Sequence, residues 1–277
     1  MATLTFENEF TRQNPGRVQL IRFMREAIGK KEVEWGDLTT LNLSKVCEYI
    51  TGRCASNSAC TYFAIIKAFL AKFKDEDLIP CKHPERILKA KKVPSQNVFL
   101  TEEEIDRIER YVPESTCERD VKAAFLIGCY LGARRSDVLQ ITRKNITENR
   151  IVYVSQKTKT EVSVPIHRNL MKYLLYKPEK ERAVGVYTYV IQKICRECGI
   201  DEKVRIFYHG KMQERKKYEF VGSHTARRSF CTNLARRGVD IYTIAALAGH
   251  GTNVEMTQKY IVSDVENLSE KTMAFFG

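Results

Sequence analysis

The sequence predicts a mainly α-helical fold with small β-hairpins, in which a helical domain precedes an α+β domain. Apolar residues recur at helical spacing through most of the chain, and two short β-rich runs flank a polar turn at 156–161. A basic, turn-rich stretch without periodicity interrupts the pattern at 89–98. A chain of 277 residues also has room for about two domains.

The N-terminal part predicts a small all-helical domain. Residues 18–28 place their apolar side chains on one helical face, with Pro15 suited to the first turn, and residues 43–50 repeat the pattern. A broad apolar stripe over 62–73 predicts a third helix. Two prolines then break the chain before a short fourth helix near Ile87.

The second domain begins with a helix-capping signal. Thr101 followed by Glu104 is a capping box, in which each side chain accepts a backbone N–H from the other residue, and it predicts a helix through Val112. On composition alone, the basic stretch before it is either an interdomain linker or a plain solvated loop. The predicted boundaries are 1–90 for the helical domain, 91–99 for a basic linker and 100–277 for the second domain.

Local patterns also predict the remaining elements of the second domain. The apolar run 121–131 predicts a helix that ends at Gly132, because glycine readily adopts the backbone conformation of a helix end. The β-rich runs 151–155 and 162–165 predict a hairpin. Further elements are expected as helices at 136–141, 170–176, 187–198, 224–236 and 241–247, and as a second hairpin with strands 204–208 and 217–221.

The charge balance favours a polyanionic partner. Lys and Arg total 46 against 34 Asp and Glu, which gives a net charge of +12. Each phosphate that such a surface neutralises releases condensed counterions, which drives association with nucleic acid. On charge alone, a basic protein without such a partner remains the alternative.

Cysteine usage and hydropathy favour a soluble protein in a reducing cytoplasm. Nine cysteines, an odd number, are spread along the chain. The one close pair, Cys195 and Cys198, has no second pair or histidine at metal-ligand spacing, so we expect one face of a helix there and no metal site. The first thirty residues contain no apolar run long enough for a signal peptide, and nowhere do eighteen apolar residues run together. We therefore expect no membrane association.

The most informative residues lie near the C-terminus. In a helix over 224–236, His224 and Arg227 are three residues apart and share a face, so both can meet one phosphate. The planar fork of arginine presents parallel donors to two phosphate oxygens. His250 follows the helix end at Gly249, and Tyr260 lies ten residues further on. Taken singly, each of these residues has a structural explanation, such as ion pairing, capping or packing.

The order of these motifs carries a resemblance. The chain reads Gly-Ala-Arg134-Arg-Ser-Asp137, then Lys157 in the predicted hairpin, then His224-x-x-Arg227, then Gly249-His250, then Tyr260. This order resembles the tyrosine recombinase, or phage integrase, family. The match spans about 100–277, and the helical N-terminal part is similar to the family's core-binding domain. The resemblance implies an α+β tyrosine-recombinase catalytic domain after that domain.

The resemblance also implies roles for the basic residues. Arg134 and Arg227 resemble the pair that grips the non-bridging oxygens of the scissile phosphate, and Asp137 resembles the acidic residue behind the first arginine. Lys157 resembles the hairpin lysine that protonates the departing 5′ oxygen. Lys159 is the rival for that role, because the register of the hairpin is open.

The remaining roles concern the nucleophile. His224 and His250 resemble the histidines that bind the phosphate and help to take the tyrosine proton. Tyr260 resembles the nucleophile that forms a 3′-phosphotyrosyl bond. The family usually places this tyrosine nine residues after the Gly-His histidine, whereas the spacing here is ten, which implies a longer loop. This chemistry needs no cofactor.

The resemblance implies duplex DNA with paired recombination half-sites as substrate, and a homo-oligomer, a tetrameric synapse, on that DNA. It further implies integration or excision of a mobile element. The apolar tail 261–277 docks on a neighbouring protomer or packs on its own domain. Basic residues outside the catalytic set are expected as solvated DNA contacts, namely Arg135, Lys159, Arg228, Lys89, Lys91 and Lys92.

Two other functions are compatible with the same motifs. A type IB topoisomerase uses a similar site to relax supercoils without exchanging partners. A non-catalytic DNA-binding protein of the same fold is the other, and the presence of every catalytic-type residue argues against it.

Overall fold

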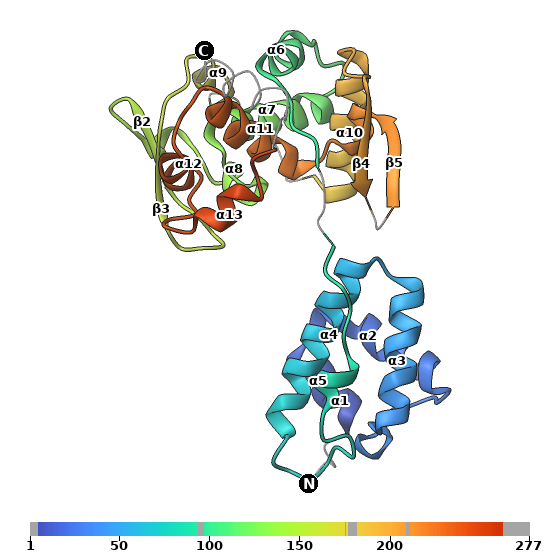
Figure 1. Ribbon diagram of the computed structural model, residues 1–277. Coiled ribbons are helices and arrows are strands. Elements are labelled where there is room, and N and C mark those ends of the chain that lie inside the picture. Colours follow the sequence, from blue (N-terminus) through green and yellow to red (C-terminus); the bar gives the residue numbers. More distant parts are fainter. Residues whose placement is uncertain (1–4, 94–96, 175, 177–181, 209–210, 263–277) are drawn as a thin grey trace, which may run out of the picture. The chain divides into compact units, whose positions relative to one another are not determined.

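The computed structural model describes residues 5–93, 97–174, 176, 182–208 and 211–262. The chain divides into two compact units, with the main boundary after residue 95. Both units are mainly helical, and short antiparallel strands occur in the second part of the chain (Figure 1). The predicted fold class, mainly α with small β-hairpins, is confirmed. None of the helices in the described ranges combines the length and apolarity that a bilayer crossing requires.

The first unit is a small bundle of helices. Prediction located α2, α3, α4 and α5, whereas α1 was not predicted. The eight residues of α1 contain only two large apolar side chains one turn apart, Phe6 and Phe10, so the sequence pattern is too short to identify a helix. The helices are α1 (Phe6–Gln13), α2 (Val18–Ile28), α3 (Thr40–Arg53), α4 (Ser56–Leu70) and α5 (Pro84–Ile87), with 3-10 turns at Pro15–Arg17, Trp35–Asp37 and Ala71–Phe73.

Aromatic side chains form the centre of the first unit. Phe6, Phe10 and Phe69 are buried, and Phe69 packs edge to face against the other two rings. Trp35 stacks on Phe69 with the ring centroids 5.9 Å apart. Such aromatic pairs stabilise a small core beyond the area they bury. A separate hydrophobic core therefore supports the N-terminal unit.

The part of the chain after residue 96 contains eight helices and two small sheets within the described ranges. The helices are α6 (Glu102–Arg110), α7 (Thr116–Leu131), α8 (Arg135–Val138), α9 (Leu170–Leu174), α10 (Val184–Glu197), α11 (Ser223–Arg236), α12 (Ile241–Leu247) and α13 (Val254–Gln258). The strands are β1 (Ile146–Thr147), β2 (Arg150–Val154), β3 (Glu161–Pro165), β4 (Lys203–Tyr208) and β5 (Lys211–Lys216).

The central helix of the second unit is α7, which is buried along almost its whole length and packs against α9, α10 and α11. Helices α7 and α11 approach closely, because a Cβ added at Gly128 would lie 3.0 Å from the Cβ of Ala226. The predicted capping box at the start of α6 is present: Glu104 N donates to Thr101 Oγ1 across 3.3 Å, and Thr101 N donates to Glu104 Oε2 across 2.8 Å. The predicted helix end at Gly132 is also confirmed, with φ +65°.

The predicted hairpin at 151–165 is confirmed as the antiparallel pair β2–β3, and β1 adds a short third strand. Ile151, Tyr153, Val162 and Val164 face the core in alternation with exposed or half-buried residues.

The second strand of the other hairpin was wrongly predicted. Lys211–Lys216 pairs with Lys203–Tyr208, and the predicted strand 217–221 instead forms a 3-10 turn over Lys217–Phe220. Lys217 is buried in that turn and donates to Glu104 Oε2 across 2.9 Å. The turn therefore docks on α6, and an apolar-looking segment serves as an anchor.

Candidate active site

Side chains from separate segments of the second unit line one open cavity of about 600 Å³. Five residues that the sequence singled out are among them: Arg134, Lys157, His224, His250 and Tyr260. The cavity therefore brings cationic side chains and a tyrosine together. The sixth, Arg227, is absent from the lining and exposes only 1% of its area, although it contacts two of the residues that line the cavity.

Arg134 precedes the first turn of α8, and a buried carboxylate organises its surroundings. Nη1 of Arg134 donates to Oγ of Ser155 across 3.0 Å, and this hydroxyl donates to Oδ2 of Asp137 across 3.2 Å. The Arg134 guanidinium also lies 3.9 Å from the same carboxylate. Asp137 accepts a second hydrogen bond, at 2.9 Å, from the backbone N–H of Gln156. Asp137 thus ties the end of β2 to the arginine.

The two candidate lysines of the β2–β3 turn differ in position. Lys157 is exposed and lines the cavity, two residues after the Ser155 that bonds Arg134. Lys159 is also exposed, has φ +55° and does not line the cavity. Of the two lysines, only Lys157 therefore lines the described cavity.

His224 is the second residue of α11, and its ring approaches Tyr260. The Tyr260 hydroxyl and His224 Nδ1 are 3.5 Å apart, with ring centroids 6.3 Å apart. The residue keeps one side open to solvent, yet burial of the ring lowers the pKa of His224, and four nearby cations, led by Arg228, lower it further. At neutral pH the imidazole is therefore uncharged, so Nδ1 can accept a proton.

The guanidinium of Arg227 is held by two turns that end helices. Nη1 donates to the carbonyl oxygen of Gly132 across 2.6 Å, and Nη2 donates to the carbonyl oxygen of Ala248. Nη2 also lies 2.6 Å from Nε2 of His250. The Tyr260 ring lies over the same guanidinium, with Cζ 5.2 Å from the ring centroid. Nε of Arg227 is buried and has no hydrogen-bond partner in the described part of the chain.

Both turns depend on glycine. Gly132 has φ +65°, and a Cβ there would lie 2.4 Å from Cδ1 of Phe230. Gly249, which follows Ala248, also has φ +65°, and a Cβ there would lie 2.6 Å from Cγ2 of Val162. A side chain at either position would be strained by its backbone and by its neighbour. The sequence pattern Gly-Ala-Arg and Gly-His therefore reflects the shape of the arginine's binding site.

The hydrogen bonds of His250 define its protonation. Arginine has donors only, so the contact with Arg227 makes Nε2 the acceptor. The proton is then on Nδ1, which donates to Oγ1 of Thr257 across 2.9 Å. Burial, reinforced by Arg227 and Arg134, lowers the pKa of His250 to about 3. Both ring nitrogens are thus engaged within the protein, and His250 is neutral.

Tyr260 follows α13, and its backbone is fastened to α11 by one threonine. Thr232 Oγ1 donates to the carbonyl oxygen of Tyr260 across 3.2 Å and accepts from the N–H of Val262 across 3.1 Å. Thr232 is fully buried, so these two hydrogen bonds fix the backbone at Tyr260 and at Val262. The phenol itself remains half-buried at the cavity.

The expectation that Arg228 is a solvated contact was wrong. Arg228 exposes 9% of its area, and its Cζ lies 5.9 Å from the centroid of the Tyr260 ring. Arg135 is half-buried: Nη1 donates to the carbonyl oxygen of Arg182 across 2.7 Å, and its guanidinium lies over the ring of Tyr187. Arg135 nevertheless lines the cavity.

Three lysines of the basic stretch 89–98, Lys89, Lys91 and Lys92, are exposed. The backbone that carries them is bonded to the first unit. Asn57 donates to the carbonyl oxygen of Val93 across 2.7 Å and accepts from its N–H across 2.9 Å. Three side chains of α3 and α4 bond the carbonyl oxygens of residues 89–91, namely Cys47, Cys60 and Ser56.

Sequence reasoning missed three residues that organise the site: Ser155, Thr232 and Thr257. All three carry ordinary hydroxyl groups, and nothing in their sequence surroundings distinguishes them from other serines and threonines. Their roles arise from contacts over long sequence separations. The predicted apolar tail lies outside the described residues except for Ile261 and Val262.

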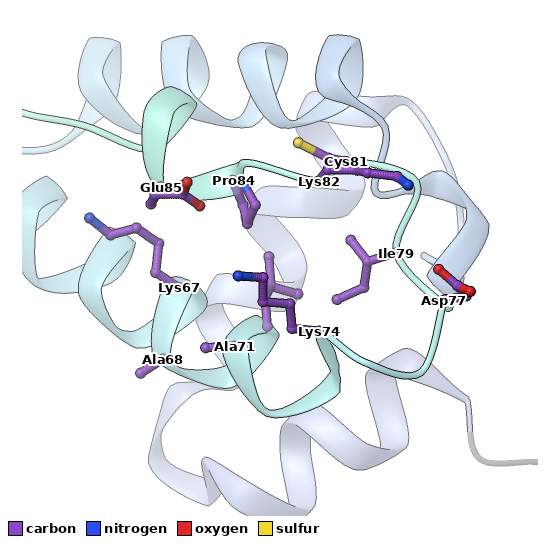
Figure 2. Close-up of a pocket in the computed structure, with 11 residues that line it drawn as sticks. Lys67, Ala68, Ala71, Lys74, Asp77, Ile79, Cys81, Lys82, Pro84 and Glu85 are labelled. Carbon is purple, nitrogen blue, oxygen red and sulfur yellow. The ribbon is translucent and has the colours of Figure 1, made fainter.

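A second cavity, of about 430 Å³, lies within the first unit. Figure 2 shows it bordered by Lys67, Lys74 and Lys82 together with Asp77 and Glu85. It holds none of the residues of the ordered motif. Among the described residues, no cluster of three or more His, Cys, Asp or Glu side chains could hold a metal ion. The nine cysteines are free thiols.

Comparison with known proteins agrees with these observations. Residues 98–267 match the model of the phage integrase family. The chain belongs to the phage integrase family. The match covers the second unit from just before α6 to beyond Tyr260, so it includes every motif on which the resemblance rested. The predicted membership of the tyrosine recombinases is thereby confirmed.

Curated relatives of this chain are tyrosine recombinases. It is 28% identical over 243 residues to the tyrosine recombinase XerA of Thermococcus kodakarensis, an alignment that covers 86% of this chain and 83% of the relative. It is 29% identical over 195 residues to XerA of Thermococcus onnurineus, which covers 70% of this chain and 64% of that protein.

Solved structures share the fold of this family member. A lambda integrase dimer bound to a COC′ core site superposes with a TM-score of 0.66 at 14% identity, over 90% of this chain and 88% of that chain. The XerH recombinase in a post-cleavage complex with a palindromic difH substrate gives a TM-score of 0.64 at 12% identity, over 92% and 76%.

Proposed function

We propose that this chain is a site-specific DNA recombinase that cleaves and rejoins strands through a phosphotyrosyl bond at Tyr260. The single observation that carries the proposal is the shared cavity, which gathers Arg134, Lys157, His224, His250 and Tyr260 from distant parts of the sequence. Family membership supports site-specific recombination as the activity. The residues supply a nucleophile, a proton acceptor, a proton donor and anion-binding groups.

In the proposed cleavage step, the hydroxyl oxygen of Tyr260 attacks the scissile phosphorus. Its proton passes to Nδ1 of His224, which lies 3.5 Å away. The bond from phosphorus to the 5′ oxygen breaks, and Lys157 donates a proton to that oxygen. The products are a 3′-phosphotyrosyl bond and a 5′-hydroxyl, and the reverse sequence joins a strand to a new partner.

Arg134 and Arg227 would neutralise the non-bridging oxygens as charge develops on them. Arg134 already faces the cavity, whereas the Tyr260 ring lies over Arg227. The unpartnered, buried Nε of Arg227 is a donor without an acceptor, which is costly unless a ligand supplies one. We therefore propose that a phosphate reaches Arg227 as the tyrosine ring moves off it.

The proposal extends to the partners of the chain. The substrate is duplex DNA with paired half-sites, bound by a homo-oligomer that forms a tetrameric synapse in the cytoplasm. The first unit binds the duplex, and its exposed lysines contact backbone phosphates, namely Lys89, Lys91 and Lys92. In the second unit, further basic residues lie near the DNA, namely Arg135, Lys159 and Arg228. The exchange serves integration or excision of a mobile element.

A trapping experiment tests the proposal. The wild-type protein is incubated with a pool of duplexes that carry a nick and a randomised core, so that the short strand beyond the cut diffuses away after cleavage. Covalent adducts are isolated under denaturing conditions, and their DNA is sequenced. We expect adducts on a defined site from the wild type, and none from Tyr260→Phe, which retains DNA binding.

The other functions give different results in this experiment. A topoisomerase yields adducts whose sequences lack paired inverted half-sites, and in a separate assay it relaxes any supercoiled plasmid. A non-catalytic DNA-binding protein shifts the duplexes but forms no adduct. Adducts that persist in Tyr260→Phe would exclude Tyr260 as the nucleophile.

A further inference from the structure

Arg228 occupies an unusual position on α11. It lies four residues after His224, so the two side chains share one face of the helix. It exposes 9% of its area, and its guanidinium carbon lies 5.9 Å from the centroid of the Tyr260 ring. The arginine therefore flanks the pair formed by the His224 imidazole and the Tyr260 hydroxyl.

In the part of the chain that the structure describes, no counter-charge neutralises Arg228. Within the described ranges, no hydrogen-bond acceptor or carboxylate contacts its guanidinium, which lies over the ring of Tyr260. Neighbouring arginines differ: Arg227 has three partners within hydrogen-bond distance, and Arg237 pairs with Glu102. A buried charge without a counter-charge costs free energy of folding. Such a cost indicates that the charge serves the site rather than the stability of the fold.

We propose that Arg228 is a positioning residue for the nucleophile. Its guanidinium holds the Tyr260 ring against α11. Its charge, one helical turn from His224, keeps the imidazole neutral, so that the imidazole can accept the phenol proton. This inference rests on the proposed function. It adds a residue to which no role in the reaction was assigned.

The charges around His224 support the inference. The groups that face it are Arg227 and Arg228 on α11, Arg134 before α8, Lys157 in the hairpin turn, and Tyr260. After burial, Arg228 is the largest cause of the lowered pKa of His224. A protonated imidazole has no free lone pair and cannot accept the phenol proton.

The consequence appears in the proton balance of cleavage. As the Tyr260 oxygen bonds to phosphorus, its proton moves to Nδ1 of His224, and the bond to the 5′ oxygen breaks. Removal of the Arg228 charge makes protonation of His224 easier in the free enzyme, so the reaction fails at a higher pH. The contact between the Arg228 guanidinium and the Tyr260 ring is lost at the same time. A smaller fraction of the molecules then holds the phenol oxygen in line with the bond that breaks.

The experiment compares Arg228→Met, Arg228→Lys and the control Arg237→Met. Arg237→Met removes the same charge just after the last turn of α11, where it pairs with Glu102 at the surface. The single-turnover rate of adduct formation is measured on the nicked site between pH 5 and 9. Thermal unfolding of each variant is recorded in parallel.

For Arg228→Met we expect about a tenfold or larger fall in the rate at neutral pH, an acid limb about one pH unit higher, and a melting temperature at or above that of the wild type. Arg228→Lys restores the charge, so its acid limb lies near that of the wild type, with partial recovery of the rate. Arg237→Met retains the wild-type rate and profile.

Three results would overturn the inference: a wild-type rate in Arg228→Met, an unmoved acid limb with a rate loss that follows a drop in stability, or identical profiles for the Met and Lys variants. Failure of the wild type to form any adduct would instead refute the proposed function. In that event, an NMR titration of His224 in wild type and Arg228→Met still decides whether Arg228 lowers the pKa of the imidazole.

Discussion

The guanidinium of Arg227 donates to Nε2 of His250 across 2.6 Å, and this contact is compatible only with a neutral imidazole. Protonation of Nε2 would direct an N–H at a buried cation. The same guanidinium is held by the carbonyl oxygens of Gly132 and Ala248. The arrangement around Arg227 is therefore coupled to pH through His250.

This coupling predicts that stability falls in acid. The folded-state pKa of His250, about 3, lies below the ordinary value of 6.5, so between these pH values the unfolded chain binds a proton that the folded chain does not. The free energy of unfolding must therefore rise with pH through this window and reach its full value above 6.5. We expect His250 to contribute roughly 2 kcal/mol of the change between pH 5 and 6.5.

Urea unfolding of the wild type and His250→Gln at several pH values measures this contribution. Glutamine can still accept a hydrogen bond from Arg227 but does not titrate. The contributions of the other histidines and of the carboxylates to the pH dependence are therefore the same in both proteins and cancel. Equal slopes of stability against pH in the two proteins would show that His250 does not titrate as described.

Gly132→Ala should destabilise the second unit strongly. The new Cβ would lie 2.4 Å from Phe230 in a backbone with φ +65°, so we expect a loss of about 3 kcal/mol or more in chemical denaturation. Gly238→Ala is the matched control, because Gly238 has φ +85° but no atom within 4 Å of the added Cβ. Its cost should be only about 1 kcal/mol. Similar losses in both variants would contradict the close packing at Gly132.

Ser155→Ala should slow DNA cleavage by about tenfold or more. The change removes the hydroxyl that bridges Arg134 and Asp137, so the arginine loses its orientation. Ser163→Ala, on the next strand, removes a hydroxyl that accepts from Arg150 at the surface and is expected to cleave like the wild type. Single-turnover adduct formation measures the cleavage rate of both variants. Equal rates would contradict a role for the Ser155 hydroxyl in orienting Arg134.

Thr232→Val should reduce adduct formation by about tenfold, because it removes both hydrogen bonds that fasten the backbone around Tyr260 without changing side-chain shape. Thr232→Ser keeps the hydroxyl and should recover most of the rate. DNA binding, measured by gel shift, should be the same for all three proteins. A serine variant as slow as the valine variant would point to packing instead.

Lys157→Ala should slow cleavage of ordinary DNA by about 100-fold, because the change removes the proposed proton donor for the leaving oxygen. A strand with sulfur in place of the bridging 5′ oxygen should be cleaved at nearly the wild-type rate, since a thiolate leaves without a proton. Lys159→Ala should weaken DNA binding without this selective rescue, because Lys159 does not line the cavity. If the sulfur-containing strand restored the rate of Lys159→Ala and not that of Lys157→Ala, Lys159 would be the proton donor instead of Lys157.

Local sequence signals predicted much of the fold. The capping box at Thr101 and the glycine end at Gly132 depend on neighbouring residues, so the pattern in the chain was sufficient to identify them. The partner of β4 could not be identified in this way. The charged segment Lys211–Lys216 pairs with it, while the more apolar Lys217–Phe220 anchors a turn through Lys217 and Glu104, which are 113 residues apart.

The candidate site was predictable where its chemistry follows an ordered motif, and less so where burial decides the role. Arg134 and Tyr260 line one cavity although 126 positions separate them. Arg228 was expected in solvent because arginine usually is, and its burial against Tyr260 depends on how α13 returns to α11. Ser155 and Thr232 carry no sequence signal, because their partners come from other elements.

The hydrogen bonds from Asn57, Ser56 and Cys60 to residues 90–93 determine where the chain can be divided. A fragment that stops at residue 90 would remove the hydrogen-bond partners of Ser56 and Asn57 on α4, which lie at Lys91 and Val93. A fragment that continues through Val93 keeps the segment that is hydrogen-bonded to α4. The shortest fragment expected to fold independently is therefore longer than the amphipathic helices alone suggest.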